Sequence, residues 1–503
     1  MSDRPNILLI TSDQQHYGTL GAINPRIKTP ALDRLASEGT RFTRAYCPNP
    51  VCSPTRASII TGQYPSQHGC WTIGVKLPED VPTVGDILQE HGYATALIGK
   101  AHFQPLGSTP ESPSLEAHPM LRDLDFWRGF HGPWYGFEHV EVARNHSDEH
   151  LAGQHYAIWM EEHGLLNWRD YFRPWPNDPD APKRKHEWDL PEEFHYSRWT
   201  GERSVAYLER CAAERKPFFL WPSFQDPHPP YLVPEPWASM YDPADMVPGK
   251  LTPGELDANP PHFQKTQEPK PDFSMYRETY GAHGFHSHLI PDQELRRCIA
   301  TYYGMISFVD QEVGRILDAL DRLGLAENTL VVFSTDHGHF LGQHGLIAKG
   351  AFHYEDMIRI PMIVRYPGRV PTGAISDSLQ SLVDCAPTFL RAAGIAVPGF
   401  MTGLSQLDAW CGTAPPPRDH IIVENRHEPT KVHLRTYVDK RYKITVYRDQ
   451  EYGELFDLQE DPGEVRNRWA DPTYAAVKLE LLRKFMNATL LCEPTRMPRV
   501  AGA

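Results

Sequence analysis

The sequence predicts an α/β fold: a large mixed, mainly parallel sheet between layers of helices, followed by a small C-terminal α+β subdomain. The first supporting observation is a set of continuous apolar runs typical of buried parallel strands, at residues 6–11, 94–98, 218–221 and 329–334. Segments with helical spacing alternate with these runs, as at residues 292–323. Beyond about residue 415, short strands separated by turns and a last helix near 473–490 favour an antiparallel sheet.

Two regions are therefore expected along the chain. Residues 1–414 would form the large domain, interrupted at about 103–200 by an insertion rich in Trp, Tyr, Phe and His. Residues 415–503 would form the C-terminal subdomain with its antiparallel sheet and terminal helix. Most rings of the insertion are expected to pack in a core, and a minority to line a substrate pocket, because such pockets are mainly apolar.

Composition and charge exclude several classes of function. A net charge of -14, with no basic tail to offset it, argues against nucleic-acid binding. The eight cysteines show no framework spacing, which favours a reducing compartment. No apolar stretch approaches the length of a membrane span or resembles a signal peptide, so we expect a cytoplasmic protein without a membrane partner. A homo-oligomer and a monomer are both compatible with these features.

Cys52 is the candidate nucleophile around which the other motifs are arranged. It follows an extended, proline-containing segment and precedes a helical run that Gly62 would end. A helix N-terminus collects unpaired N–H groups, which favour anions and activated nucleophiles. Arg56, one turn later, adds a fixed cation at the same end.

Other interpretations of Cys52 remain open at this point. A lone cysteine is usually a small buried hydrophobe, and Cys47 with Cys52 is compatible with a disulfide or with half of a metal site. Zinc is disfavoured because the spacing is not Cys-x-x-Cys and no second pair follows. The pattern Cys-x-Pro-x-Arg followed by Thr61-Gly62 favours a specialised site instead.

Two pairs of polar residues follow predicted strands and indicate a metal site. Asp13 and Gln14 come directly after the strand at 6–11, and Asp336 and His337 follow the strand at 329–334. Ligands bind at the carboxyl edge of open α/β sheets. A mainly oxygen donor set suits Ca²⁺, Mg²⁺ or Mn²⁺ better than zinc, which prefers Cys and His.

The segment from Cys52 to Gly62 resembles the signature of type I sulfatases, a family of the alkaline phosphatase superfamily in which that cysteine is oxidised to formylglycine. The resemblance implies an alkaline-phosphatase-like fold and one divalent metal, with Ca²⁺ preferred over Mn²⁺ and Mg²⁺. Its ligands would be Asp13, Gln14, Asp336, His337 and the modified Cys52. One departure is Asp336-His337 in place of the commoner Asp-Asn, which leaves the choice between calcium and manganese open.

The resemblance also assigns roles to four further residues. Lys100 and His102 match the family's Lys-x-His, His228 matches its substrate-binding histidine before proline, and Lys349 matches its later lysine. The metal, Arg56, Lys100 and Lys349 would bind the sulfate group, because negative charge develops in the transition state. His102 would be the base that regenerates the aldehyde, and His228 with Lys349 would protonate the leaving alcohol.

The resulting expectation is a hydrolase of aryl, choline or carbohydrate sulfate monoesters. Its partners would be a small-molecule sulfate ester and a formylglycine-generating enzyme. One alternative is a phosphonate or phosphate ester hydrolase of the same superfamily, although that group tends to carry uncharged residues where Lys100 and His102 stand. Another is a noncatalytic, metal-bound sugar-binding protein with an unmodified Cys52.

Overall fold

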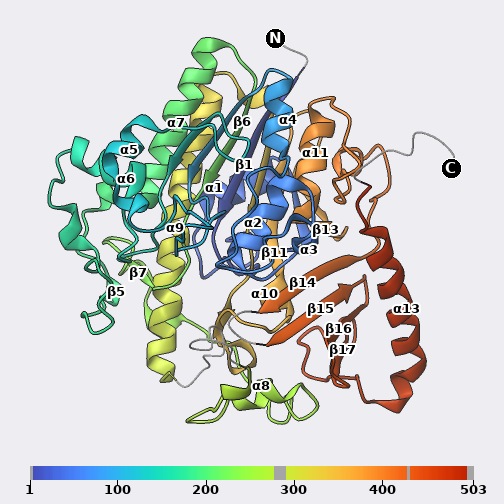
Figure 1. Cartoon of the computed structure of the whole chain (residues 1–503). Coiled ribbons are helices and arrows are strands. Elements are labelled where there is room, and N and C mark those ends of the chain that lie inside the picture. The colour runs from blue at the N-terminus through green and yellow to red at the C-terminus, as the bar shows by residue number, and fades with distance from the viewer. Residues whose placement is uncertain (1–3, 277–289, 428–430, 496–503) are drawn as a thin grey trace.

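The computed structural model describes residues 4–276, 290–427 and 431–495 (Figure 1). In these residues the main sheet has nine strands, in the order β12-β2-β11-β8-β1-β6-β3-β4 with β13 beside β2. Met1 to Asp3, expected to lead into the first strand, lie outside these residues. Only the pairs of β11 with β2 and with β8 are antiparallel. The strands are β1 Asn6–Ser12, β2 Thr40–Tyr46, β3 Ala94–Gly99, β4 His139–Val142, β6 Phe218–Ser223, β8 Thr329–Thr335, β11 Arg359–Arg365, β12 Ala374–Ser376 and β13 Gln380–Ser381. The predicted mixed, mainly parallel sheet is confirmed.

Strand β1 shows why the sequence forms this sheet. All seven of its residues are buried, so the strand is apolar on both sides. Ile7 and Leu9 pack in one core cluster, whereas Leu8 and Ile10 pack in another on the opposite face. This alternation follows from the two-residue period of a strand, and it places a layer of helices on each face of the sheet.

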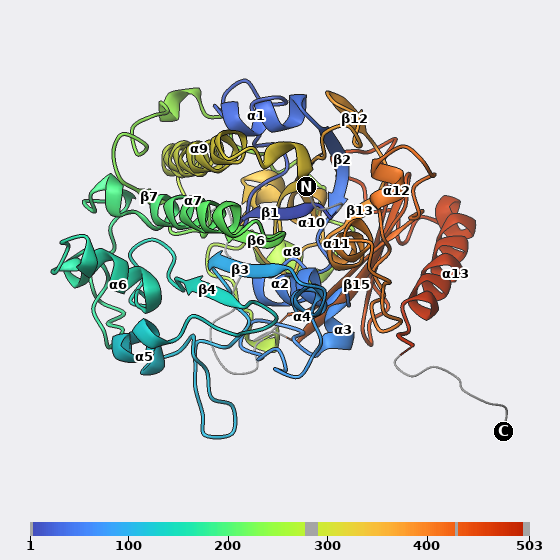
Figure 2. The same ribbon diagram turned by 90° about the horizontal axis from the view of Figure 1, so that it is seen from above.

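The two helical layers are visible from above (Figure 2). One face is covered by α1 Pro30–Ser37, α7 Tyr196–Glu214 and α9 Asp292–Arg322. The other is covered by α2 Cys52–Thr61, α4 Val84–Glu90 and α11 Cys385–Ala392. The segment 292–323, for which helical spacing was noted, forms the single helix α9, and α7 was not predicted from the sequence.

The aromatic-rich segment forms a small layer of its own at the side of the molecule. It contains α5 Leu124–Gly129, α6 Gln154–Glu162 and β5 His186–Glu187. Trp168 and Trp188 are buried in its core, as expected of packing residues, whereas Trp175 is 46% exposed. Strand β4 of this segment pairs with β3 and extends the main sheet.

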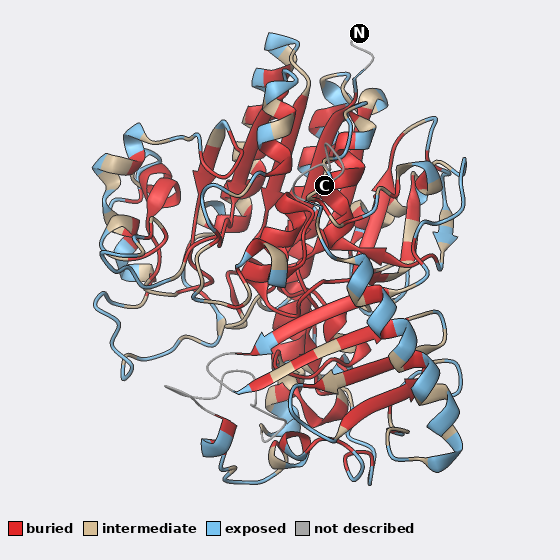
Figure 3. Cartoon of the chain, turned by 45° about the vertical axis from the view of Figure 1, so that its right-hand side comes forward, coloured by how far each residue is buried: buried red, intermediate tan, exposed pale blue. Residues whose placement is uncertain are grey.

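A second, antiparallel sheet forms the C-terminal layer, as predicted. Its elements are β14 Ile421–His427, β15 Val432–Val438, β16 Tyr442–Tyr447, β17 Gly453–Asp457 and α13 Ala475–Leu491. Ile422 and Leu455 face α13, whereas Val423 and Phe456 face the large domain. The outer surface of α13 is exposed (Figure 3).

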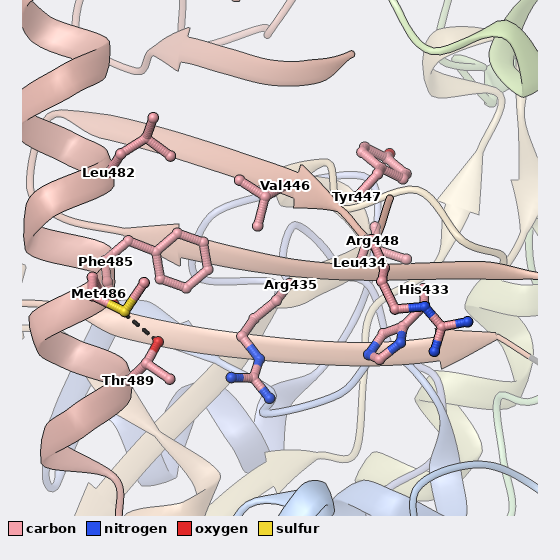
Figure 4. A pocket seen from close by; sticks show the side chains of 10 residues that line it. All are labelled: His433, Leu434, Arg435, Val446, Tyr447, Arg448, Leu482, Phe485, Met486 and Thr489. Atoms are coloured by element: carbon pink, nitrogen blue, oxygen red, sulfur yellow. Dashed lines mark hydrogen bonds between the residues drawn. The ribbon is translucent and has the colours of Figure 1, made fainter. Parts of the chain in front are cut away.

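A groove of about 430 Å³ lies between α13 and the strands β15 and β16 (Figure 4). Its walls combine apolar side chains such as Val446 and Phe485 with the guanidinium groups of Arg435 and Arg448. None of the residues singled out in the sequence analysis lines it.

Shorter elements complete the described chain: α3 Pro65–His68, β7 Leu232–Val233, α8 Pro261–Lys265, β9 Phe340–Leu341, β10 Ile347–Ala348, α10 Glu355–Ile358 and α12 Leu407–Trp410. None of the helices described is both long enough and apolar enough to cross a membrane.

Candidate functional site

The register of two central strands brings the predicted metal ligands together. β1 and β8 run parallel, and Ser12 pairs with Thr335 at the last position of the ladder. The next residues, Asp13 and Asp336, therefore leave the sheet side by side at its carboxyl edge. The Gln14 backbone N–H donates to Asp336 Oδ1 at 3.0 Å, which fixes the two turns against each other.

Cys52 lies at the same edge as the first residue of α2. The residue before it, Val51, is extended, and the helix closes at Gly62, whose φ of 63° suits glycine. Cys52 Sγ lies 3.1 Å from His337 Nε2 and 3.3 Å from Lys349 Nζ. Burial and the charge of Asp13 raise the pKa of this thiol, but Lys100 and Lys349 outweigh them, so that the pKa is lowered overall.

The donor atoms at this edge fit a divalent metal. Ligand atoms of Asp13, Cys52, Asp336 and His337 all lie within 4.8 Å of one another, and the four residues are buried. Gln14 Nε2 is hydrogen bonded to His339 Nδ1 at 2.8 Å, whereas Gln14 Oε1 is buried without a hydrogen-bond partner among the described residues. A buried amide oxygen without a partner beside two carboxylates is the arrangement expected of an oxygen-rich cation site.

Fixed cations surround the same group. Arg56 is fully buried, and its Nε donates to Asp336 Oδ2 at 2.9 Å. Its Nη1 donates to Ser223 Oγ at 2.6 Å, and within the described chain Nη2 has no hydrogen-bond partner. Lys100 Nζ donates to Asp13 Oδ2 and lies 2.8 Å from His146 Nε2. These charges allow Asp13 to stay ionised although it is buried, since burial raises its pKa but Lys100 and other cations lower it well below the usual value.

His228 and Lys349 form a connected pair on the side of Cys52. Lys349 Nζ lies 3.0 Å from His228 Nε2, so it is within reach of both the imidazole and the Cys52 sulfur. The His228 ring stacks on His146 with centroids 3.8 Å apart. Burial, His146 and Lys349 lower the pKa of His228 well below its usual range, so its ring is neutral and accepts a hydrogen bond from the lysine.

His102 joins the cluster through another residue. Its Nε2 lies 3.0 Å from Arg144 Nη2, and its backbone is left-handed with φ of 59°. The Glu116 carboxylate accepts the backbone N–H groups of His102, Phe103 and Gln104 at 2.7, 2.8 and 2.8 Å. Burial and the positive charge of Arg144 lower the pKa of His102 well below its usual value, which leaves a neutral imidazole able to take up a proton.

The sequence analysis missed Arg144, His146 and Glu116. Arg144 is buried, and its Nε and Nη1 have no hydrogen-bond partner in the described part of the chain. Arg144 and His146 come shortly after β4, so they reach the site by the same strand-end rule that predicts Asp13 and Asp336. Recognition of β4 as a strand of the main sheet would have identified them.

The alternative interpretations of Cys52 as half of a disulfide or of a cysteine metal site fail. All eight cysteines lie in the described residues, and each is a free thiol. Cys47 is buried with its Sγ 4.0 Å from the Met357 carbonyl oxygen, and burial raises its pKa well above the usual value.

A candidate nucleophile at a helix N-terminus, a group of side chains that could hold a cation and a cluster of fixed positive charge lie together at one sheet edge, as expected of a hydrolase of anionic esters. The family model described as Sulfatase matches residues 5–395, and the one described as N-sulphoglucosamine sulphohydrolase, C-terminal, matches residues 342–490. The chain belongs to the sulfatase family, in the alkaline phosphatase superfamily, and it is an enzyme of the sulfuric ester hydrolase class. The noncatalytic alternative is therefore not supported.

Relatives of several kinds share this architecture over nearly the whole chain. An arylsulfatase of Clostridium perfringens is 29% identical over 96% of this chain and 94% of its own length. The multifunctional alkaline phosphatase superfamily protein PehA of Trinickia caryophylli is 28% identical over 96% of this chain and 95% of its own. The crystal structure of the phosphonate monoester hydrolase of Agrobacterium radiobacter superposes with a TM-score of 0.79 at 25% identity, covering 97% of this chain and 96% of that one.

Proposed function

We propose that the protein hydrolyses sulfate monoesters with formylglycine at position 52 and one divalent metal held by Asp13, Gln14, Asp336 and His337. The observation that carries the proposal is the convergence of His337 and Lys349 on the Cys52 sulfur, at 3.1 and 3.3 Å, beside the buried carboxylates. The metal would polarise the sulfate group, and the hydrated aldehyde would supply the attacking oxygen. Ca²⁺ is the preferred ion by the family resemblance, and the mainly oxygen donor set would also suit Mn²⁺ or Mg²⁺.

The chain's own residues then have distinct tasks. Arg56 and Lys100 provide fixed positive charge where negative charge develops on the sulfate oxygens. Lys349 lies between the nucleophile and His228, so this pair would deliver the proton to the leaving alcohol. His102, kept neutral by its surroundings, would accept the proton that accompanies release of sulfate.

Phosphonate or phosphate ester hydrolysis remains the second candidate function. One finding favours it: two phosphonate monoester hydrolases are among the solved structures that this chain resembles. Against it, Lys100 and His102 both lie in the buried cluster, and Lys100 pairs with Asp13. The ammonium group of Lys100 and the imidazole of His102 suit sulfate ester hydrolysis, because one would bind the sulfate group and the other would accept a proton.

The test compares esters on one preparation of the enzyme. The protein is produced with and without a formylglycine-generating enzyme, and kcat/KM is measured for aryl, choline and sugar sulfates and for a phosphonate monoester. We expect a sulfate ester to be the best substrate and activity to rise with the fraction of Cys52 found as aldehyde by peptide mass spectrometry. Full activity with wholly unmodified Cys52 would refute the mechanism, and a phosphonate far better than every sulfate would favour the second candidate.

A neighbouring cysteine gives a matched control. Cys52→Ala should abolish activity, whereas Cys47→Ala, at a residue equally buried on the approach to α2, should retain most of it. Loss of activity in both variants, with both proteins folded, would show that the effect is structural.

A further inference from the structure

A second group of ligand-type side chains lies apart from the candidate site, between β5 and the first turns of α9. It consists of His186, Glu294 and Cys298, whose potential ligand atoms lie within 4.8 Å of one another. None of these residues contributes to the cluster around Cys52. The group therefore needs an explanation of its own.

The helix supplies two of the three side chains with suitable geometry. Glu294 and Cys298 are four residues apart on α9, so they lie on one face of the helix. His186 comes from β5, which is held beside β7 by parallel pairing of His186 with Leu232. The His186 backbone has φ of 68°, a left-handed conformation that is unusual for a residue other than glycine.

Hydrogen bonding fixes the tautomer of the histidine. The Thr301 hydroxyl donates its proton to the Arg297 carbonyl oxygen at 3.0 Å. Because Thr301 Oγ1 can then only accept, His186 Nδ1, 3.0 Å away, must be the donor. In a neutral ring this tautomer leaves the lone pair on Nε2. This Nε2 is buried without a hydrogen-bond partner among the described residues.

The unpartnered nitrogen faces a carboxylate at a distance characteristic of shared coordination. His186 Nε2 and Glu294 Oε1 are 3.4 Å apart, and no hydrogen bond joins them in the described structure. Two ligands each about 2.0 Å from one tetrahedral zinc ion would lie about 3.3 Å apart. The buried thiol of Cys298 completes a nitrogen, oxygen and sulfur set, which is the set that zinc prefers.

We propose that His186, Glu294 and Cys298 bind a zinc ion, with Thr301 orienting the imidazole and the fourth position taken by water. On binding, the Cys298 thiol loses its proton to solvent and the zinc–sulfur bond forms without any change of oxidation state. Lys185 Nζ, 3.4 Å from Glu294 Oε1, competes for the carboxylate, but this side chain is 73% exposed and can turn into water.

Such an ion would fasten the aromatic-rich layer to helix α9. The His186 N–H donates to the Tyr231 carbonyl oxygen at 3.0 Å, and the Trp188 N–H donates to the Val233 carbonyl oxygen at 3.0 Å. These contacts hold the segment that follows His228. The proposed site is thus a structural clamp that would hold this segment, through β5, against α9.

The test isolates this site from the candidate catalytic metal. The full chain carrying Asp13→Ala and Cys52→Ala, which removes two ligands of the catalytic centre, is titrated with Co²⁺ as a spectroscopic substitute for zinc. We expect one equivalent to bind with a thiolate-to-cobalt absorption band, and zinc to displace it. A cobalt complex without a thiolate band, or no binding, would overturn the proposal.

Further substitutions in the same background identify the ligands. Cys298→Ser should remove the thiolate band, whereas Cys211→Ser, at another buried free thiol, should keep it. Thr301→Val preserves the shape of the side chain but removes the acceptor for His186 Nδ1, so metal affinity should fall about 10–100-fold. A band that survives Cys298→Ser would place the ion elsewhere, and unchanged affinity in a folded Thr301→Val variant would exclude the orienting role.

Discussion

Glu116 offers the sharpest test of how the site is held, because its carboxylate alone accepts three backbone N–H groups of the loop that carries His102. Glu116 is 1% exposed, so water cannot replace these hydrogen bonds. In Glu116→Gln the amide offers only one acceptor oxygen, and at least one N–H loses its partner. An unsatisfied buried donor costs about 1–3 kcal/mol, and Glu116→Ala, which leaves three, should cost about 3–9 kcal/mol.

The loop conformation connects this stability loss to catalysis. His102 has a left-handed backbone, which the three hydrogen bonds maintain against its intrinsic cost of about 1–3 kcal/mol. We expect kcat for Glu116→Gln to fall about 10–100-fold, since small displacements of a catalytic group have effects of that size. Urea unfolding and steady-state kinetics measure the two effects, with the exposed Glu111→Gln as control. Unchanged stability and turnover in Glu116→Gln would refute the reasoning.

Three further predictions concern the metal, the base and the pH dependence. Asp13→Ala should lose the calcium held with Gln14, Asp336 and His337 together with activity, while circular dichroism stays unchanged; undiminished calcium content would move that site elsewhere. His102→Ala should release about one equivalent of alcohol in a burst and then stall with sulfate retained on the protein, whereas a mere loss of substrate affinity would contradict the assigned role. His344 should stabilise the fold in a pH-dependent way: burial alone would lower its pKa, but the hydrogen bonds that its ring donates to Asp356 and Glu255 raise it to about 9. Because the folded pKa exceeds the unfolded value of about 6.5, up to about 3 kcal/mol of stability is present below that pH and is lost as pH rises through about 9. In His344→Gln the free energy of unfolding should depend less steeply on pH between about 6.5 and 9. An equally steep pH dependence would show that His344 is not its origin.

Much of the fold was predictable where a single physical pattern dominates. The continuous apolar runs of β1 and β8 indicated buried parallel strands, and Asp13 and Asp336 followed from the rule that ligands gather at their carboxyl ends. Cys52 was placed at a helix N-terminus by Gly62 and the extended segment before it. The structure has all three features.

The rest depended on signals too weak to detect in isolation. Strand β4 is the four-residue sequence His-Val-Glu-Val, of which only two side chains are apolar, within a segment dominated by aromatic residues. Helix α7 mixes buried Trp199 and Leu208 with many charged residues and Gly201, so its helical period is faint. Arg144 and His146 were not predicted because β4, the strand that precedes them, was not recognised. The role of Glu116 rests on contacts between a loop and a side chain a dozen residues away, which no local period reveals.

The pairing of Ser12 with Thr335 makes the geometry of the candidate metal site depend on the register of β1 and β8. The spacing of the carboxylates that follow is set by the last hydrogen bonds of the ladder at the centre of the sheet. A one-residue slip of either strand would turn every buried side chain to the opposite face as well as separate the two carboxylates. Binding of a metal by Asp13 and Asp336 would therefore require the correct register of β1 and β8. A preparation in which this metal site is fully occupied should be one whose core has assembled in register.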